Sequence, residues 1–273
     1  MADPIVRKLP PMTALEFAIA STFRHFFFGL WLAVLWVILL LPFMAAVYFT
    51  AFRSGMPDFK ALPPAALAAF AALGVAALLA SFSIMVNWHR RILLNEKPRR
   101  LGWVRLNGVV WKYFFGFLLI VIILGVFAGV IFGLMTYGVP ALEPHLNTMA
   151  KPVSTVVAVL LGLSGLFTWY RLSTWLPALA TGDKDYTLGK AWRTTRKNRI
   201  RFLSFTFWLL FSLAITGAVG AGAFFAQKAL ANGYATAGAY ALIGILGWLA
   251  LFLFATVATS HYAHFTGKSE PTE

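Results

Sequence analysis

Continuous apolar runs dominate this chain, and they lack the alternation of apolar and polar positions that marks a membrane β-barrel strand. Six runs are long enough to cross a bilayer, because a membrane-spanning helix needs about 20 mostly apolar residues. The sequence therefore predicts an all-α polytopic membrane protein with transmembrane helices at Phe27–Phe52, Pro64–Val86, Phe114–Val139, Val153–Trp169, Phe202–Ala226 and Ala237–Ser260. The fourth run extends to Ala180 if one charged residue, Arg171, is tolerated inside it.

The composition supports a membrane location for these runs. Of the 273 residues, 60% are hydrophobic and 12% are charged, whereas a soluble domain is about 45–50% apolar and about 25% charged. This balance excludes a soluble enzyme, and nucleic acid is not expected as a partner although the net charge is +14. The sequence contains no cysteine, which excludes disulfides, thiolate metal sites and cysteine nucleophiles.

Lys and Arg residues are distributed very unevenly between the two sides of the predicted membrane. Nineteen lie in the N-terminal segment, in the loops after the second and fourth spans and in the tail, whereas four lie in the other loops (Arg53, Lys60, Lys151 and Lys228). Short loops rich in Lys and Arg remain in the cytoplasm. The sequence thus predicts a single membrane domain, 1–273, with both termini in the cytoplasm.

A basic, helix-like segment precedes each pair of predicted spans. Each of the three is expected to form an amphipathic helix in the membrane interface, and their starts lie about 87 residues apart. The segments are Thr13–Phe26, Arg99–Tyr113 and Thr187–Arg201. This pattern suggests three parallel units of one interface helix and one helical hairpin, at 12–90, 98–171 and 187–264. The general arrangement of interface helices and hairpins would also produce it without a true repeat.

Polar and ionisable residues are costly inside a bilayer and usually mark the functional sites of membrane proteins. Such residues are scarce in the predicted spans. No Asp, Glu, Lys or His lies within them, and Arg171 is the one embedded charge. This weakens the case for a proton-coupled transporter or a cation channel. The Arg171 side chain either reaches toward the cytoplasmic surface or contacts an anion or a lipid headgroup.

Small residues line one face of the third span, where Gly125, Gly129 and Gly133 recur every four residues. Such spacing predicts close helix packing. Contact within the six-helix bundle is one interpretation, and an interface between two copies of the chain is the other.

No catalytic or metal-binding arrangement is evident in the sequence. His261 and His264 have a short spacing, but neither an acidic residue nor a third histidine stands near them, so no metal site and no cofactor is expected. An enzyme acting on lipid headgroups would have only His89, Glu96 and His261 as candidates for acid–base chemistry. We therefore expect a protein without catalytic activity.

Two motifs resemble segments of a known group of proteins. The first motif, W-H-R-R-I-L-L-N-E-K-P at 88–98, resembles the W-H-R-x-x-L-L-x-E-x-P segment of uncharacterised polytopic inner-membrane proteins of alphaproteobacteria. The second motif, L-G-K-A-W-R-T-T-R-K-N at 188–198, resembles their L-x-x-A-W-R-x-T-R-G-N segment, with Lys197 where Gly is usual. It is also similar to part of the membrane domain of some glycerophosphodiester phosphodiesterases, whose catalytic activity does not carry over. The resemblance implies a bacterial inner-membrane location, with both motifs on the cytoplasmic side.

The two motifs supply the candidate contact residues. Trp88 and Trp192 are expected at headgroup depth, where aromatic rings anchor helices, and guanidinium groups beside them suit phosphates. The candidate contacts for a lipid headgroup or a partner are Trp88, Arg90, Arg91, Arg171, Trp192, Arg193 and Arg196. The expected function is binding of anionic phospholipid or of a membrane-protein partner, which includes a second copy of the chain. A small transporter or pore for a lipid or apolar metabolite is the alternative, and charges that only enforce topology are the simplest interpretation of the motifs.

Overall fold

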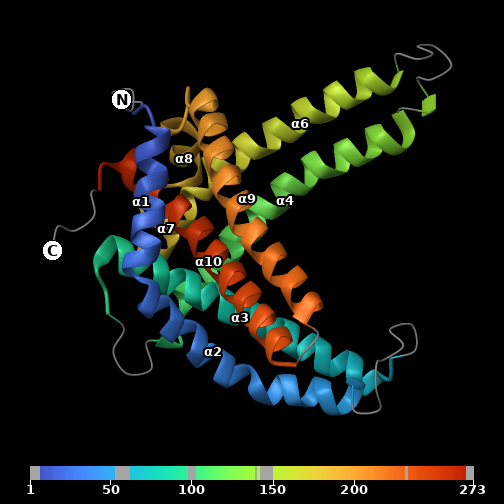
Figure 1. The fold of residues 1–273 in the computed structure, drawn as a ribbon. Helices are drawn as coiled ribbons and strands as arrows, with labels where there is room; N and C mark the ends of the chain where they lie inside the picture. Colours follow the sequence, from blue (N-terminus) through green and yellow to red (C-terminus); the bar gives the residue numbers. More distant parts are fainter. Residues whose placement is uncertain are drawn as a thin grey trace.

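A computed structural model describes residues 7–52, 62–97, 103–138, 140–141, 150–230 and 233–268. These residues fold into helices and short connections, with no strand among them. The helices are α1 (Pro11–Arg24), α2 (Phe26–Val47), α3 (Pro64–Leu94), α4 (Gly108–Gly133), α6 (Ala150–Ser173), α7 (Trp175–Thr181), α8 (Leu188–Thr194), α9 (Arg199–Leu230) and α10 (Gly233–Thr266) (Figure 1). Two π-helical turns, Tyr48–Phe52 and Leu134–Gly138, extend α2 and α4.

Six helical stretches in the described part of the chain are long and apolar enough to cross a membrane, which confirms the all-α polytopic fold. They are Phe26–Phe52, Pro64–Leu94, Gly108–Gly138, Pro152–Thr181, Arg199–Gly222 and Leu246–Thr266. The fourth continues past Arg171 as expected, but it is interrupted at Thr174, between α6 and α7. Pro177 explains the interruption, because a proline ring clashes with the carbonyl four residues earlier and offers no N–H to it.

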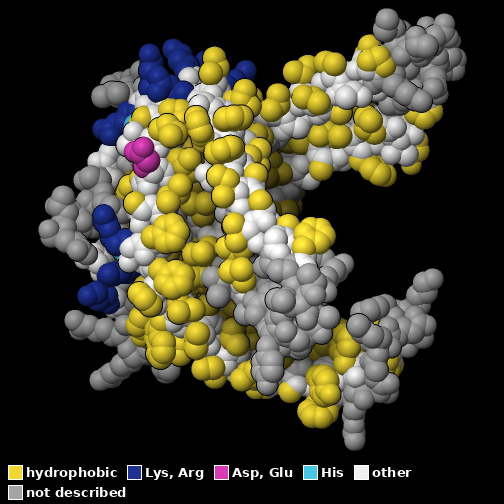
Figure 2. All heavy atoms as spheres, in the orientation of Figure 1, with side chains coloured by type: hydrophobic (Ala, Val, Ile, Leu, Met, Phe, Trp, Pro, Cys, Tyr) yellow, Lys and Arg dark blue, Asp and Glu magenta, His cyan; other side chains and the backbone are white. Residues whose placement is uncertain are grey.

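The spans pair into three hairpins, α2–α3, α4–α6 and α9–α10. Figure 1 shows them meeting beside α1, α7 and α8 and diverging toward their connecting loops. Lys and Arg side chains gather on the side where the hairpins meet, whereas apolar side chains cover the hairpins (Figure 2). We call this side, formed by α1, α7, α8 and the adjoining helix ends, the basic end. The side chains of the four cations predicted for the opposite side lie outside those described.

Helices α7 and α10 hold the basic end together. In the apolar 18-residue stretch of α10, 56% of the residues are buried, whereas 6% are buried in the corresponding stretch of α4. Ala178 and Ala180 of α7 are completely buried, and α7 contacts α3, α4 and α10. The three hairpins are therefore joined at the basic end, and most of their remaining surface is left for lipid.

Only the first of the three basic segments forms the predicted helix over most of its length. Thr13–Phe26 falls in α1 and the start of α2, with a break at His25. In the second segment, residues 99–102 lie outside the described part, residues 103–107 are not α-helical, and Gly108 begins α4 directly. The prediction of a separate interface helix before the third span is therefore not met by the described residues.

Within the third basic segment α8 ends at Thr194 and α9 begins at Arg199, so the prediction of one continuous helix across Thr187–Arg201 is wrong. Lys197 takes a left-handed backbone conformation, with φ of 68°. Asn198 holds this turn against the N-terminal segment, because its Oδ1 accepts from the N–H of Leu9 at 2.9 Å and its Nδ2 donates to the carbonyl of Arg7 at 3.1 Å. Tertiary hydrogen bonds thus outweigh the local helical pattern.

The glycine stripe of α4 does not pack closely against the described residues. A Cβ atom at Gly125, Gly129 or Gly133 would meet no described atom of a neighbouring element within 4 Å, so the described residues do not meet the prediction of close packing inside the bundle. This face of α4 lies beyond the basic end, where the hairpins diverge. Close approach occurs instead at Gly29, where a Cβ would lie 3.0 Å from the Trp88 ring. An interface between two copies through the stripe stays a prediction.

Candidate functional site

Trp88, at the start of the first motif, lies inside the protein. It is 1% exposed, its indole N–H donates to Oγ1 of Thr256 at 2.8 Å, and its ring meets that of Phe252 edge-on with centroids 4.2 Å apart. The prediction that the Trp88 ring anchors its helix by contact with lipid headgroups is therefore wrong. Gly29 explains the difference, because the absence of a side chain there leaves room for the indole ring against α2.

Arg90 of the first motif is paired within the protein. Its Nε donates to Oε2 of Glu96 at 2.6 Å, and its Nη1 donates to the carbonyl of Ala180 at 3.0 Å. Arg105 donates to the other carboxylate oxygen of Glu96, also at 2.6 Å. Burial by itself raises the pKa of Glu96, but the hydrogen bonds and charges of the two arginines outweigh it and lower that pKa. Arg90 therefore does not present an unpaired charge to a headgroup.

Arg91 and His89 are likewise held by their neighbours. The guanidinium of Arg91 lies over the ring of Phe28, 5.7 Å from its centroid. The completely buried His89 ring lies between Oγ1 of Thr259, 2.7 Å from Nδ1, and the hydroxyl of Tyr113, 2.9 Å from Nε2. The first motif therefore joins α2, α3, α4 and α10 to one another.

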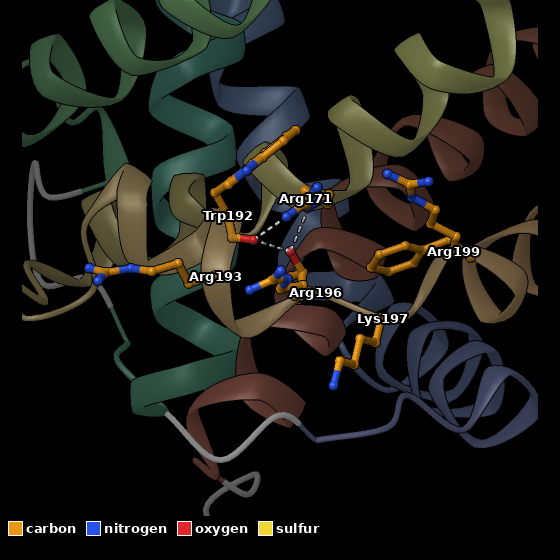
Figure 3. A pocket seen from close by; sticks show the side chains of 8 residues that line it. Arg171, Trp192, Arg193, Arg196, Lys197 and Arg199 are labelled. Carbon is orange, nitrogen blue, oxygen red and sulfur yellow. Dashed lines mark hydrogen bonds between the residues drawn. The ribbon is translucent and has the colours of Figure 1, made fainter. Parts of the chain in front are cut away.

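Arg171, within the fourth span, is fixed against the second motif. Its Cζ lies 3.3 Å from the centroid of the Trp192 ring, a cation–π contact, and its Nη2 donates to the Trp192 carbonyl (Figure 3). Its Nε donates to Oγ1 of Thr195 at 3.3 Å. A guanidinium carries five N–H donors, so these bonds orient Arg171 and leave three donors for a ligand.

Arg171 and the second motif border a cavity of about 620 Å³, which we call the basic cavity (Figure 3). Its lining residues come from the end of α6, from α8, from the turn after α8 and from the start of α9. They are Arg171, Trp192, Arg193, Thr195, Arg196, Lys197, Arg199 and Phe202. Four of the seven predicted contact residues thus lie around one cavity, although Arg193 extends away from Arg171 and donates to the carbonyl of Gly189.

Among the described residues, the basic cavity is lined mostly by cations and by no carboxylate. Five of its eight lining residues are Arg or Lys, and none of the five forms an ion pair with another described residue. Asp183, which precedes the second motif, accepts instead from the hydroxyl of Tyr262 at 2.5 Å and from Nζ of Lys268 at 2.8 Å. Burial raises the pKa of Asp183, but these hydrogen bonds outweigh it and lower that pKa to about 2. The positive charge around the cavity therefore lacks a counter-charge from the described protein.

An apolar groove of about 410 Å³ continues from the basic cavity and shares Arg171, Trp192 and Arg199 with it. We call this space the apolar groove. Its other lining residues come from α4 and α6 and are Phe127, Leu160, Leu163, Ser164, Phe167 and Thr168. Figure 2 shows the molecule hollowed on the side where the α4–α6 hairpin diverges from the remaining helices. The site therefore combines a cationic part with an apolar part.

The three residues considered for catalysis do not share a site. His89 and Glu96 have the partners given above. His261 is completely buried against the ring of Phe205, and its ring nitrogens have no hydrogen-bond partner among the described residues. None of the three lines the basic cavity or the apolar groove. Among the residues described, no three His, Asp or Glu gather in a group that could hold a metal ion.

Two further cations of the site, Lys197 and Arg199, were not among the predicted contacts. Four Arg or Lys within seven residues, from Arg193 onward, were the signal that could have included them. The apolar groove had no such signal, because Phe127 and Leu163 belong to different helices and nothing in the sequence pairs them.

Six apolar helices and a basic end on one side define a multi-pass helical membrane protein. No protein-family model matches the chain, and no curated protein and no solved structure matches it. The resemblance of the two motifs to inner-membrane proteins of alphaproteobacteria therefore stays a prediction.

Proposed function

We propose that this protein binds anionic phospholipid at its basic end and acts as a non-catalytic scaffold or accessory subunit of the membrane. The observation that carries the proposal is the basic cavity, where five cations without a described carboxylate partner surround one space. Arginine suits such a role, because its planar guanidinium donates two parallel hydrogen bonds to a phosphate.

Electrostatics favour an anion in the basic cavity. Like charges about 8–16 Å apart repel one another by about 1–2 kcal/mol per pair at an effective dielectric constant near 20, and by less where salt screens them. A bound phosphate replaces this repulsion with attraction. Because Trp192 and Thr195 already hold Arg171 in one orientation, little side-chain freedom is lost when a ligand arrives.

The proposed location of the basic end is the cytoplasmic leaflet of a bacterial inner membrane. The one-sided distribution of Lys and Arg supports this orientation, and so does the resemblance of the two motifs. Each basic residue near an anionic leaflet contributes about 1 kcal/mol of attraction. The general attraction of the basic end and the specific cavity would therefore act on the same lipids.

Native mass spectrometry of the protein extracted from its own membrane tests the proposal. We expect wild-type protein to retain phosphatidylglycerol or another anionic phospholipid. The double variant R196Q/R199Q should retain at least fivefold less, because it removes two cavity cations. The matched control K184Q/K190Q removes two exposed cations that do not line the cavity, and it should retain lipid like the wild type.

Two results would contradict the proposal. Equal lipid retention by R196Q/R199Q and the wild type would show that the cavity does not bind lipid. Loss of a co-purifying protein from R196Q/R199Q, with lipid retention unchanged, would assign the cavity to a protein partner instead.

Raising the salt concentration should weaken lipid retention in the wild type more than in R196Q/R199Q, since fewer charges take part in the variant.

A further inference from the structure

We infer that the basic cavity and the apolar groove together hold one anionic phospholipid, with its phosphate in the cavity and an acyl chain in the groove. This inference rests on the proposed function and adds how the lipid is oriented on the protein. Its occupant is a lipid and not a free phosphate, because a free phosphate would leave the groove unused.

The continuity of the two spaces is the first argument. Arg171, Trp192 and Arg199 line both of them, so the cationic part begins where the apolar part ends. A phospholipid has the same order of parts, with a charged phosphate directly above an apolar chain. The fixed guanidinium of Arg171 stands at this junction, and the phosphate is expected to lie against it.

The length of the groove is the second argument. Its lining on α6 runs from Leu160 to Arg171, which corresponds to about 16 Å at the α-helical rise of about 1.5 Å per residue. The hydrocarbon core of a bilayer is about 30 Å thick, so this length matches one leaflet. An acyl chain that starts at the basic end would therefore lie along the groove over its whole length.

The chemistry of the groove is the third argument. Its two hydroxyl groups are already hydrogen-bonded to their own helix, since Ser164 donates to the carbonyl of Leu160 at 2.9 Å and Thr168 donates to that of Ser164 at 2.8 Å. The remaining lining, apart from the junction residues, is Phe and Leu. The groove therefore fits an alkyl chain and offers little to a polar ligand.

Ser164 allows the groove to be closed without a change of charge. We expect S164W to fill the groove and to lower the retention of phosphatidylglycerol at least fivefold in native mass spectrometry. The matched control is S81W, because Ser81 is also exposed on a spanning helix and donates to the carbonyl four residues earlier, at 2.8 Å. Ser81 lies on α3 and does not line the groove. The S81W variant should therefore retain lipid like the wild type.

Photo-crosslinking provides a second measurement that does not depend on a variant. Phosphatidylglycerol with a diazirine in one acyl chain would be incorporated into phosphatidylcholine vesicles that contain the wild-type protein. We expect labelling of residues 160–168 that falls when unlabelled phosphatidylglycerol is added. Labelling of the exposed face of α3 around Leu78, which meets bulk lipid, should change little.

The outcomes separate this inference from the proposed function. If S164W retains lipid like the wild type and residues 160–168 show no competed labelling, while R196Q/R199Q loses lipid, the cavity binds a headgroup alone and the inference is wrong. If R196Q/R199Q also retains lipid, both proposals are wrong. Size-exclusion profiles like that of the wild type are required of S164W and S81W, and a misfolded S164W would leave the decision to the crosslinking of the wild type.

Discussion

The first and second motifs both contain a tryptophan with an arginine one or two residues after it, yet the two tryptophans and their arginines have opposite roles in the structure. In the first, Trp88 is buried between helices and Arg90 is paired with Glu96. In the second, Trp192 is 42% exposed and serves as a surface against which Arg171 stacks. The first motif holds hairpins together, whereas the second borders a cavity with cations that form no ion pair among the described residues.

This difference shows that a count of basic residues does not identify an anion site. The loop after the second span and the loop after the fourth are similarly basic. In the loop after the second span, one carboxylate, Glu96, forms ion pairs with both Arg90 and Arg105. In the loop after the fourth span, Asp183 pairs with Lys268 and not with a cation of the cavity. The position of the few acidic residues therefore decides which cations are left for a ligand.

The largest expected effect separates the two tryptophans. W88A should lower the free energy of unfolding by about 3–5 kcal/mol, because it leaves a cavity in the core and removes one hydrogen bond to Thr256. W192A should lower it by about 1 kcal/mol or less, since the ring is partly exposed. Thermal unfolding in detergent measures both, and equal losses would contradict the assignment of one tryptophan to the core and the other to the surface.

Removal of the shared carboxylate is expected to have the next largest effect. E96A should cost about 1–3 kcal/mol of unfolding free energy, because it leaves two partly buried guanidinium groups without their partner. The cost should fall in the lower part of that range, since the Glu96 side chain is 31% exposed. D185A, at an exposed acid, should change stability by less than about 0.5 kcal/mol.

E96A also sharpens the comparison between the motifs. With Arg90 and Arg105 unpaired, the first motif should gain anionic lipid, which native mass spectrometry would detect as additional bound phosphatidylglycerol. An E96A variant as stable as the wild type, with no additional lipid, would show that pairing does not distinguish the two regions.

A smaller effect follows from the titration of Asp183. Its pKa is lowered from 3.8 to about 2 in the folded protein, so its contribution to stability is complete above about pH 4 and is lost as the pH falls toward 2. The difference in melting temperature between the wild type and D183N should therefore stay constant at neutral pH and shrink below about pH 4. Parallel profiles for the two proteins would contradict the interaction of Asp183 with Tyr262 and Lys268.

The smallest expected effect concerns Lys197, whose left-handed backbone costs a non-glycine residue about 1–2 kcal/mol. K197G should raise the free energy of unfolding by up to about 1 kcal/mol, since the greater freedom of glycine in the unfolded chain offsets part of the gain. It should also reduce lipid retention about twofold, because a cavity cation is lost. The control K190G lies in helix α8 and should lose up to about 1 kcal/mol; a loss of stability in K197G would show that this backbone is not strained.

The predictions from sequence were accurate for the spans and uneven for the site. Arg171, Trp192, Arg193 and Arg196 line one cavity. The last three follow one another closely in the chain, whereas Arg171 joins them because α6 packs against α8. The sequence predicts Trp88 as an anchor among the headgroups and not as a core residue, since the short motif around it gives no sign of its contacts. Its hydrogen-bond partner, Thr256, lies in the last helix.

The sequence by itself determined the six spans and the one-sided distribution of charge, because both depend on residues that are neighbours along the chain. Only the tertiary structure decided which cations are paired, that Trp88 belongs to the core, and that α4 and α6 form an apolar groove beside α8 and α9. The physical reason is that burial and ion pairing act between groups that approach in space. Trp88 and Thr256, for example, belong to different hairpins, and they come into contact where the hairpins meet at the basic end.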